Sequence, residues 1–368
     1  MKRNILALAA IALSVACTND DTYEMSNFVG NDTIAISYQG ATATVTGNAD
    51  FVSTKVSGAD VEVNAYTSKH LVIRLSGSSA DGSLIVYGKK KYTLLLEGLS
   101  LTNADGPAIN NQCGKSLYIV TADGTVNTLA DGNAYTERTD IDQKGTLFSE
   151  GQIYFQGNGT LNINGHCKHA VASDDYVVFD QGTVNITSAG EHGVKGKDSV
   201  LISGGVVNIV VTGGGAKGIR SNGPVLISGG QTTISTTGDA CVKSESDEES
   251  SEETDSISAC AGIKCDSIFS MTGGELTISS TGDGGKGINS PQEIRQSGGK
   301  LVVTATGSEE LSKPKAVKSE TAIILSGGHF DAYSRKSKAC DNAGSDEPTI
   351  VGSPAEASIE KRHVVVIF

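Results

Sequence analysis

Basic side chains recur at fixed places along a chain whose formal net charge is −13 at pH 7. In four repeated segments a base directly follows a pair made of a small and an aliphatic residue: Lys195, Arg220, Lys264 and Lys318. A second set of bases precedes the same pair: His169, His192, Lys217, Lys286 and Lys315. If these segments stack in space, their bases form a cationic strip that can bind an extended polyanion. The alternative is that the long side chains cover turn backbone and pair with acids such as Asp198 and Asp266.

Acidic residues follow closely behind these bases and suggest a metal ion. Asp174, Asp175, Asp198 and Asp266 fall at one corner of successive segments, together with the amide Asn222. Stacked carboxylates repel one another unless a cation joins them, and Ca²⁺ accepts several oxygen ligands in flexible geometry. We therefore predict calcium at Asp174, Asp175 and Asp198, with ordinary turn residues as the alternative. A second cluster, Asp123, Asn127 and Asp131, leaves the same two interpretations open.

An internal repeat positions both sets of residues. The aliphatic member of the repeated pair is Val171, Val194, Ile219, Ile263, Ile288 and Val317, at intervals of about 23–29 residues apart from one longer interval. A fixed offset of ten residues leads from this aliphatic to a turn position that is usually the first of two glycines, and an alternating strand follows. Units of this kind bury their apolar faces only by stacking. The sequence therefore predicts an all-β fold, a right-handed parallel β-helix whose interior holds these six residues as a ladder.

The same alignment sets the expected boundaries of the solenoid. A ladder of small residues should form a tight corner: Ser173, Gly196, Ser221, Cys265, Ser290 and Ser319. The β-helix should span residues 30–345, and residues 346–368, which end in the apolar segment RHVVVIF, should cap the last coil. Residues 244–258 form an acidic insert, which we expect to be a solvated loop.

The sequence does not determine which cysteines form disulfides. Six cysteines follow Cys17 in the chain: Cys113, Cys167, Cys241, Cys260, Cys265 and Cys340. None belongs to a CxxC motif, so a zinc site is not expected. Cys241 and Cys260 flank the acidic insert, and a disulfide between them would close its base if the chain is oxidised.

The N-terminus has the pattern of an export signal. Lys2 and Arg3 precede a short apolar run, and the run ends at Ser14-Val15-Ala16-Cys17. This resembles a bacterial lipoprotein box, with residues 1–16 as signal peptide, Cys17 as the lipidated residue and residues 17–29 as a flexible tether. We expect an outer-membrane lipoprotein at the cell surface, held to the membrane only through Cys17. An ordinary secretory peptide is the alternative.

Several segments resemble one known family. They include YTLLLEGLSLTNADGPAIN, TADGTVNTLADG, AVASDD and HGVKGKDSVLISGGVVNI, in this order. The chain resembles the parallel-β-helix carbohydrate-binding domain family of bacterial surface proteins over residues 30–330. The resemblance implies a pectate-lyase-like shape, binding of acidic plant-type polysaccharide, and bound calcium, without a demonstrated catalytic activity. The acidic insert departs from the family pattern.

We therefore predict a non-catalytic, monomeric surface lipoprotein that binds anionic polysaccharide, and we assign no catalytic residue. The ligand-binding residues would be His192, Lys195, Lys217, Arg220 and Lys264. One alternative is a calcium-dependent polysaccharide lyase that uses Lys195 or Lys217 beside Asp198. Another is a structural or adhesive envelope protein without a glycan ligand. Nucleic acid is not an expected partner of so acidic a chain, and the absence of Trp disfavours an aromatic platform for neutral glycans.

Overall fold

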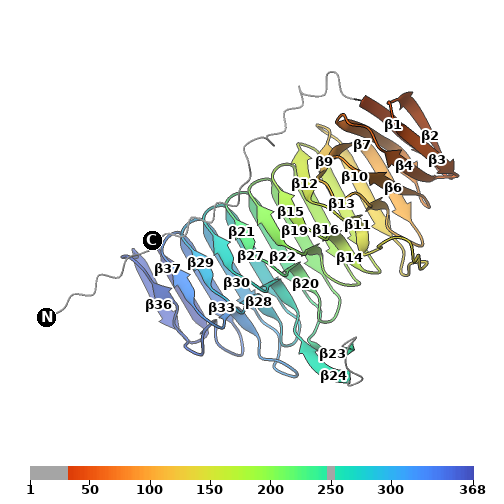
Figure 1. Ribbon diagram of the computed structural model, residues 1–368. Coiled ribbons are helices and arrows are strands. Elements are labelled where there is room, and N and C mark those ends of the chain that lie inside the picture. The colour runs from red at the N-terminus through yellow and green to blue at the C-terminus, as the bar shows by residue number, and fades with distance from the viewer. Residues whose placement is uncertain (1–31, 247–252) are drawn as a thin grey trace.

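The computed structural model describes residues 32–246 and 253–368. The predicted signal peptide, the lipidated Cys17 and the tether all lie outside these residues. The described residues form strands and turns, and they contain no helix of the length and apolarity needed to cross a membrane. The strands build a parallel β-solenoid of about 11 turns, with coils of roughly 25 residues. This confirms the predicted parallel β-helix, which Figure 1 shows as one elongated stack.

Each central coil contributes three strands to three parallel ladders. The first ladder is a twelve-stranded sheet: β3 (Val52–Ser57), β4 (Asp60–Ala65), β6 (Ser83–Gly88), β8 (Ile109–Asn111), β11 (Gly145–Ser149), β14 (His169–Ser173), β17 (Val194–Gly196), β20 (Lys217–Ser221), β25 (Ala261–Cys265), β28 (Lys286–Ser290), β31 (Lys315–Ser319) and β34 (Cys340–Asn342). The second ladder holds β9 (Leu117–Thr121), β12 (Ile153–Gly157), β15 (Tyr176–Phe179), β18 (Ser199–Ile202), β21 (Val225–Ile227), β26 (Phe269–Met271), β29 (Ile294–Gln296), β32 (Ile323–Leu325) and β35 (Thr349–Ile350).

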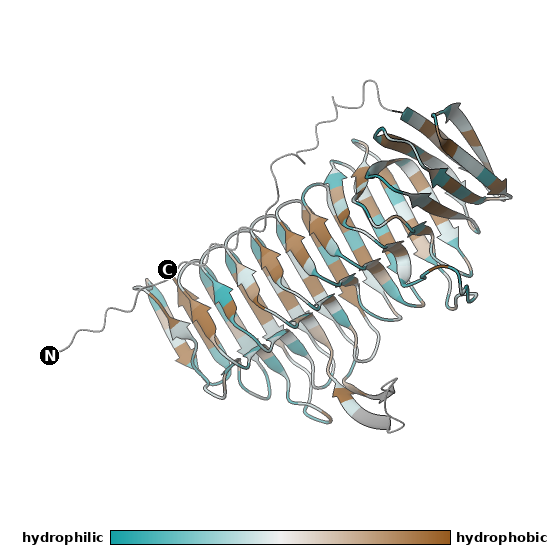
Figure 2. Cartoon of the chain, in the orientation of Figure 1, coloured by the Kyte–Doolittle hydropathy of each residue, from teal (hydrophilic) through white to brown (hydrophobic). Residues whose placement is uncertain are grey.

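The third ladder completes the coil: β10 (Val126–Asp131), β13 (Thr160–Gly165), β16 (Thr183–Ser188), β19 (Val206–Val211), β22 (Gln231–Thr236), β27 (Glu275–Ser280), β30 (Lys300–Ala305) and β33 (His329–Ser334). Near the N-terminal end, the long strands β1 (Asp32–Gln39), β5 (Leu71–Ser79) and β7 (Tyr92–Asn103) join the second and third ladders, because β7 pairs with both β9 and β10. Figure 2 shows apolar residues running along the strands of every coil.

The interior aliphatic ladder has the predicted register. Val171 pairs with Val194, Val194 with Ile219, Ile219 with Ile263, Ile263 with Ile288 and Ile288 with Val317. All six side chains are fully buried. The ladder continues upstream through Leu147, Ile109, Leu84 and Val61, in coils whose sequence repeats less regularly. One continuous core thus runs through the solenoid.

Glycine permits the close approach of neighbouring coils at two kinds of position. Gly205 and Gly230, each the second glycine of its pair, have φ values of 70° and 72°, which only glycine adopts at little cost. Gly218 lies against the core instead, where an added Cβ would stand 2.3 Å from Cγ2 of Ile234. The repeat therefore keeps a small residue before each interior aliphatic residue because the next wall of the coil packs there.

Antiparallel strands close both ends of the stack. At the N-terminal end β2 (Thr42–Asn48) pairs with β1, and β3 pairs with β4. At the other end β37 (His363–Ile367) pairs with β33 and with β36 (Glu356–Glu360), and it buries Val364 and Val366 against the last coil. At the C-terminal end this covering is confined to the third ladder, whereas β34 and β35 are the last described strands of the first and second ladders.

The acidic insert differs from the expected loop. Its described parts form a hairpin, in which β23 (Cys241–Ser246) pairs antiparallel with β24 (Glu253–Ser258). Residues 247–252 lie outside the described residues. Cys241 and Cys260 are separate thiols, as are the other four cysteines of the described chain. The Cys260 thiol donates instead to the carbonyl oxygens of Gly213 and Asp239, at 3.4 and 3.3 Å. The hairpin is therefore held by backbone pairing and not by a disulfide.

Candidate functional site

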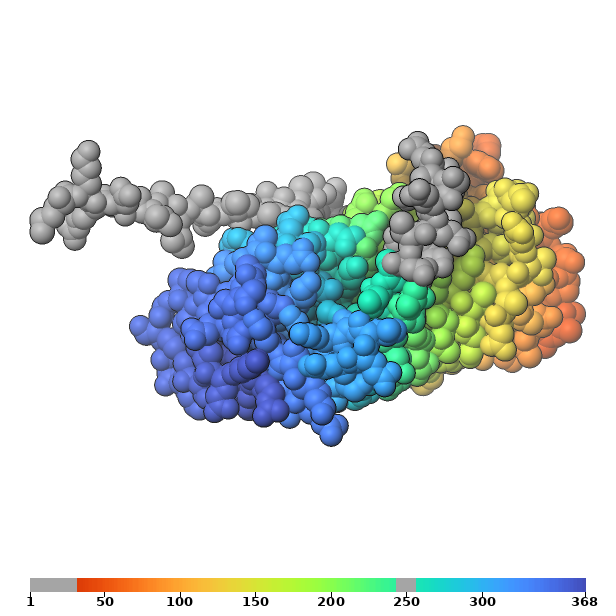
Figure 3. Space-filling model, turned by 90° about the horizontal axis from the view of Figure 1, so that it is seen from below, coloured from red at the N-terminus to blue at the C-terminus, as the bar shows by residue number. Residues whose placement is uncertain are grey.

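Three long connections leave the third ladder at the same corner and border the outward face of the twelve-stranded sheet. They comprise residues 132–144 before β11, residues 237–260 before β25, and residues 306–314 before β31. We call the outward face of this sheet the outer sheet face. Figure 3 views the solenoid from below, with its coils in order from red at the N-terminal end to blue at the C-terminal end. These insertions turn a regular surface into one with distinct pockets.

Bases stand in consecutive coils along the outer sheet face. Lys195 pairs in register with Arg220, Arg220 with Lys264, Lys264 with Asn289 and Asn289 with Lys318. Their neighbours in each strand point into the core, so these side chains point outward. We call Lys195, Arg220, Lys264 and Lys318 the basic row. Parallel pairing sets its members about 4.8 Å apart per coil.

Partners hold several members of the basic row. The Lys195 ammonium donates to Oδ1 of Asn222 at 2.9 Å, and Lys318 lies 3.1 Å from Glu320. Arg220 forms an ion pair with Asp266, as the structural alternative for these bases anticipated. Burial, together with the neighbouring Arg220, lowers the pKa of Lys195. The row is thus a pre-arranged cationic surface that local polar groups neutralise only in part.

His192 and Lys217 lie beside the row with structural contacts of their own. The imidazole of His192 stacks on that of His169, with ring centroids 4.9 Å apart, and its Nδ1 accepts the backbone N–H of Lys217. Lys217 is buried, and its ammonium donates to the Gly215 carbonyl at 2.5 Å and to Oγ of Ser258 at 2.8 Å. Lys217 therefore attaches the base of the hairpin to the sheet.

A pocket between the hairpin and the 306–314 connection gathers four lysines. Its volume is about 260 Å³, and its lining consists of Lys217, Ile257, Ser258, Ala259, Lys264, Lys286, Asn289, Leu311, Ser312 and Lys318. We call it the lysine pocket. The sequence assigned Lys217 and Lys264 to the site but not Lys286 and Lys318, although both occupy the same repeat positions. The repeat does not reveal that the hairpin and the 306–314 connection enclose these two lysines.

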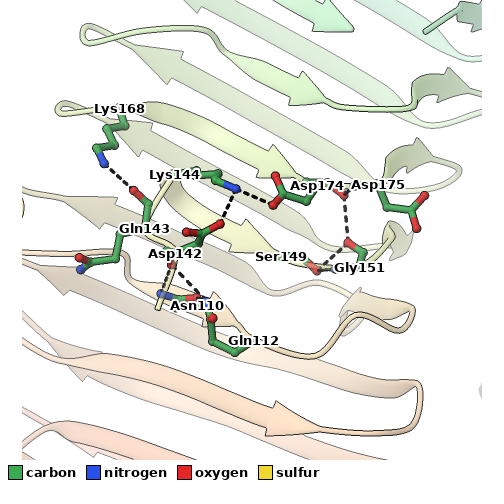
Figure 4. Close-up of polar contacts among 11 residues, drawn as sticks. Asn110, Gln112, Asp142, Gln143, Lys144, Ser149, Gly151, Lys168, Asp174 and Asp175 are labelled. Carbon is green, nitrogen blue, oxygen red and sulfur yellow. Dashed lines mark hydrogen bonds and ion pairs between the residues drawn. The ribbon is translucent and has the colours of Figure 1, made fainter. Parts of the chain in front are cut away.

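The predicted metal-binding acids do not converge on one point. The carboxylate of Asp174 clusters with those of Asp142 and Glu150, with one oxygen of each within 4.8 Å of the others. Asp175 instead accepts a hydrogen bond from Gln152. Figure 4 shows the carboxylate of Asp174 turned toward Lys144 and that of Asp175 turned away. Asp198 contacts Asp175 through a backbone hydrogen bond, in which the Asp198 N–H donates to the Asp175 carbonyl at 2.9 Å.

Lys144 already supplies a positive charge at this acidic corner, which we define as Asp142, Lys144, Glu150 and Asp174. Its ammonium lies 2.5 Å from a carboxylate oxygen of both Asp142 and Asp174. Burial, with Asp174 and Asp142 nearby, raises the pKa of Glu150. Three carboxylates in this arrangement fit the hard oxygen donors that Ca²⁺ prefers. An ion would have to displace the Lys144 ammonium from between them.

The second acidic cluster is structural. Asn127 is fully buried, and its Oδ1 accepts the backbone N–H groups of Gly98 and Leu99, each at 2.9 Å. Asp131 accepts the Tyr135 hydroxyl at 2.5 Å and the His166 N–H at 2.7 Å. Asp123 accepts from Asn158 on a different turn. Each side chain is engaged separately, which agrees with turn residues and not with a shared ion.

A second pocket lies near the N-terminal end of the outer sheet face. Its volume is about 280 Å³, and the 132–144 connection forms one wall through Thr136, Arg138, Ile141 and Gln143. The strands provide Asp60, Glu62, Asn103 and Asn110, among others. Such a mixture of amide, carboxylate and guanidinium groups offers both donors and acceptors, which suits hydroxyl-rich ligands.

A solenoid face with side chains repeated at every coil suits an extended ligand that also repeats. The fold and this face define a β-solenoid of the carbohydrate-recognition type. The chain belongs to the carbohydrate-binding domain-containing protein family, whose model matches residues 57–309. The matched range includes the acidic corner and most of the basic row.

Two known proteins are similar to parts of the chain. A carbohydrate-binding domain-containing protein of Acetivibrio thermocellus is 28% identical over 104 residues, which cover 27% of this chain and 36% of that protein. The match thus spans about a third of the relative's length. The solved structure of a polysaccharide lyase-like protein from C. thermocellum, a gadolinium derivative, superimposes with a TM-score of 0.56 at 25% identity. It covers 72% of this chain and 96% of that one.

Proposed function

We propose that the protein binds acidic polysaccharide along its outer sheet face and does not cleave it. The observation that carries this proposal is the basic row, because a chain of strongly negative net charge sets its bases in register in consecutive coils. Two unit charges about 4.8 Å apart repel by on the order of 1 kcal/mol even in water. A bound polyanion relieves that repulsion, and carbohydrate binding is the property that names the family.

Binding of polygalacturonate to a double variant, Lys195→Ala with Arg220→Ala, tests this proposal. Exposed charge pairs contribute about 0.2–1 kcal/mol each, so we expect a loss of affinity between about two- and thirtyfold by calorimetry. The matched control replaces Arg295 and Lys300, two half-exposed bases on other ladders, and should bind as the wild type does. Equal affinity of both double variants, or binding that does not weaken with added salt, would contradict the proposal.

Calcium is part of the proposal, and we place it at the acidic corner. Asp174 is the predicted ligand that the geometry supports, and Asp142 and Glu150 would act with it in place of Asp175 and Asp198. The ion would supply a positive charge beside the basic row for the same polyanion. Chelation should then weaken polygalacturonate binding in the wild type. If a chelator leaves binding unchanged, the basic residues recognise the polysaccharide without calcium.

A lipid anchor at Cys17 would place this face at the cell surface, on a monomeric protein. The support is the sequence pattern of residues 1–17 alone. Partition of the full-length chain into a detergent phase, and its loss in a Cys17→Ser variant, tests the anchor. Recovery of the wild-type protein in the aqueous phase would refute the lipid anchor.

A polysaccharide lyase is the second candidate, favoured by the similarity to the solved structure of a polysaccharide lyase-like protein. The reaction needs a base that removes the proton beside the uronate carboxyl group. The lowered pKa of Lys195 is in the direction that a base requires, although its ammonium is bonded to Asn222. Ultraviolet absorbance of an unsaturated product on incubation with polygalacturonate and calcium would establish the lyase. Absence of binding to any glycan would favour a structural envelope role.

A further inference from the structure

The pocket near the N-terminal end of the outer sheet face, which we call the N-terminal pocket, is lined by three carboxylates that are each held by one oxygen. Each accepts one hydrogen bond from a neighbouring side chain: Ser83 donates to Oδ1 of Asp60 at 2.7 Å, Asn64 to Oε1 of Glu62 at 3.0 Å, and Thr136 to Oδ2 of Asp105 at 3.2 Å. No donor among the described residues reaches the other oxygen of any of the three. These carboxylates are therefore fixed in orientation and can still accept hydrogen bonds from a ligand.

The walls of the N-terminal pocket are fixed by buried amides. Asn103 and Asn110 line the pocket and are both buried. The Asn103 side chain donates to the Pro107 carbonyl at 2.8 Å and holds the turn that forms one wall. The Asn110 side chain donates to the Asp142 carbonyl at 2.9 Å and holds the 132–144 connection, which forms the opposite wall. The pocket is therefore formed before any ligand binds.

The charge of the N-terminal pocket disfavours an acidic sugar. Beside the three carboxylates its lining includes two bases, Lys55 and Arg138, and Arg138 already forms an ion pair with Asp140 at 2.7 Å. With Asp140, four acids therefore face two bases, and a uronate or sulfate would meet net repulsion. A metal ion is not favoured either, because in the described part of the chain only the acidic corner brings three such ligand atoms within 4.8 Å of one another.

We propose that the N-terminal pocket binds one uncharged sugar unit, whose hydroxyl groups donate to the open oxygens of Asp60, Glu62 and Asp105. This site is distinct from that of the proposed function, which concerns acidic sugar units on the basic row. Hydrogen bonds to ionised acceptors are roughly twice as strong as those between neutral groups, so three such acceptors favour a ligand rich in hydroxyl donors.

The size and the remaining lining of the N-terminal pocket suit one sugar unit. Its volume of about 280 Å³ lies just below the range of about 300–1,000 Å³ found for drug-sized ligands. Ile85 and Ile141 offer an apolar surface to the C–H groups of a sugar ring. The side-chain amide of Gln143 can donate to a sugar oxygen. The pocket therefore offers both the polar and the apolar contacts that a saccharide makes.

The N-terminal pocket and the basic row lie along the same column of residues in the twelve-stranded sheet. In-register pairing leads from Glu62 through Ile85 to Asn110, and then through one residue in each of the next two coils to Lys195. Asn110 and Lys195 are thus three coils apart, roughly 14 Å along the solenoid. A single glycan that contains both neutral and acidic units can therefore contact both places.

Titration of neutral disaccharides into the full chain tests the N-terminal pocket. The probes are cellobiose, xylobiose and galactobiose, followed by ligand-observed NMR with a chelator present, and we expect at least one of them to bind. Glu62→Gln and Asp105→Asn preserve the shape of the pocket and remove one charge each. Each variant should lower the affinity for that disaccharide at least about fivefold, because one acceptor is no longer ionised. An excess of digalacturonate, which is similar in size but charged, should not displace it.

The matched control is Asp123→Asn. The carboxylate of Asp123 also accepts one side-chain hydrogen bond, from Asn158 at 3.1 Å, but it lies outside the pocket lining, so the disaccharide should bind this variant as it binds the wild type. Circular dichroism verifies that each variant is folded. Failure of all three neutral disaccharides to bind, wild-type affinity in both pocket variants, or displacement by digalacturonate would overturn the assignment of this pocket.

Binding of polygalacturonate separates this site from the proposed function. If the basic-row double variant loses polygalacturonate affinity while the pocket variants bind the neutral disaccharide normally, the pocket assignment fails and the proposed function stands. If the pocket variants lose the neutral disaccharide while the double variant binds polygalacturonate normally, the proposed function fails and the pocket assignment stands. If neither set of variants changes binding, both fail.

Discussion

Replacing Lys286 with Met should change how the stability of the protein depends on pH. The pKa of Lys286 falls from its usual 10.5 to about 8, mainly because the ammonium is buried. The folded state therefore disfavours the charged form, and between pH 8 and 10.5 the unfolded chain binds more protons than the folded one. At 1.36 kcal/mol per unit, the charged ammonium costs about 3 kcal/mol of stability at pH 7.

This cost should fall as the ammonium loses its proton. At pH 9.5 more than half of this cost is gone, so wild-type stability should rise relative to the variant by about 2 kcal/mol between pH 7 and 9.5. The pH dependence follows from the two pKa values alone, so differences between the two proteins that do not change with pH, such as altered packing, cancel in the comparison. Cys260, Lys264, Lys315 and Lys318 also face this region, but both proteins contain them.

Urea unfolding of both proteins at several pH values measures the difference. The reasoning requires the free energy of unfolding of the wild type to rise relative to that of the variant as the pH rises. Parallel curves would show that Lys286 is solvated in the folded state, and the electrostatic basis of the lysine pocket would be lost.

Two further outcomes follow from packing and from charge. Gly218→Ala should destabilise the protein by about 1–3 kcal/mol, because its Cβ would lie 2.3 Å from Ile234 Cγ2 and 2.6 Å from the Gly262 carbonyl oxygen. Gly114→Ala has no atom within 4 Å of the new Cβ, and its melting temperature should stay near that of the wild type; equal effects of the two changes would refute the packing argument. Glu150→Gln should weaken Ca²⁺ binding in a direct titration, whereas Asp140→Asn, which changes an exposed acid two residues before Asp142, should not. Unaltered Ca²⁺ affinity in the Glu150 variant would remove the acidic corner as the metal site.

The sequence predicted the parts of the fold that repeat in every coil. The interior ladder from Val171 to Val317 follows from the fixed offset to the turn, because parallel pairing places equivalent residues above one another. The outward position of Lys195 and Arg220 follows from strand alternation. Upstream, Leu147 and Ile109 continue the ladder, but their coils differ in length, so the repeat alone did not place them.

The parts of the site that depend on insertions could not be predicted. The hairpin and the 306–314 connection fold over Lys217 and Lys286, and no repeat position encodes such contacts. The acids show the same limit. Asp174 and Asp175 are adjacent in sequence, so their side chains diverge at the corner. The partners of Asp174 lie in the preceding coil, Asp142 before β11 and Glu150 directly after it.

Chemical modification of lysines in the presence of polygalacturonate tests the central claim most directly. The outer sheet face carries Lys195, Lys264 and Lys318, whereas Lys300 lies on the third ladder and Lys69 precedes β5. Acetylation followed by mass spectrometry should show protection of the first three lysines by the glycan, and unchanged reactivity of Lys300 and Lys69. Protection of Lys300 or Lys69, or of no lysine at a glycan concentration that binds, would contradict the assignment of this face.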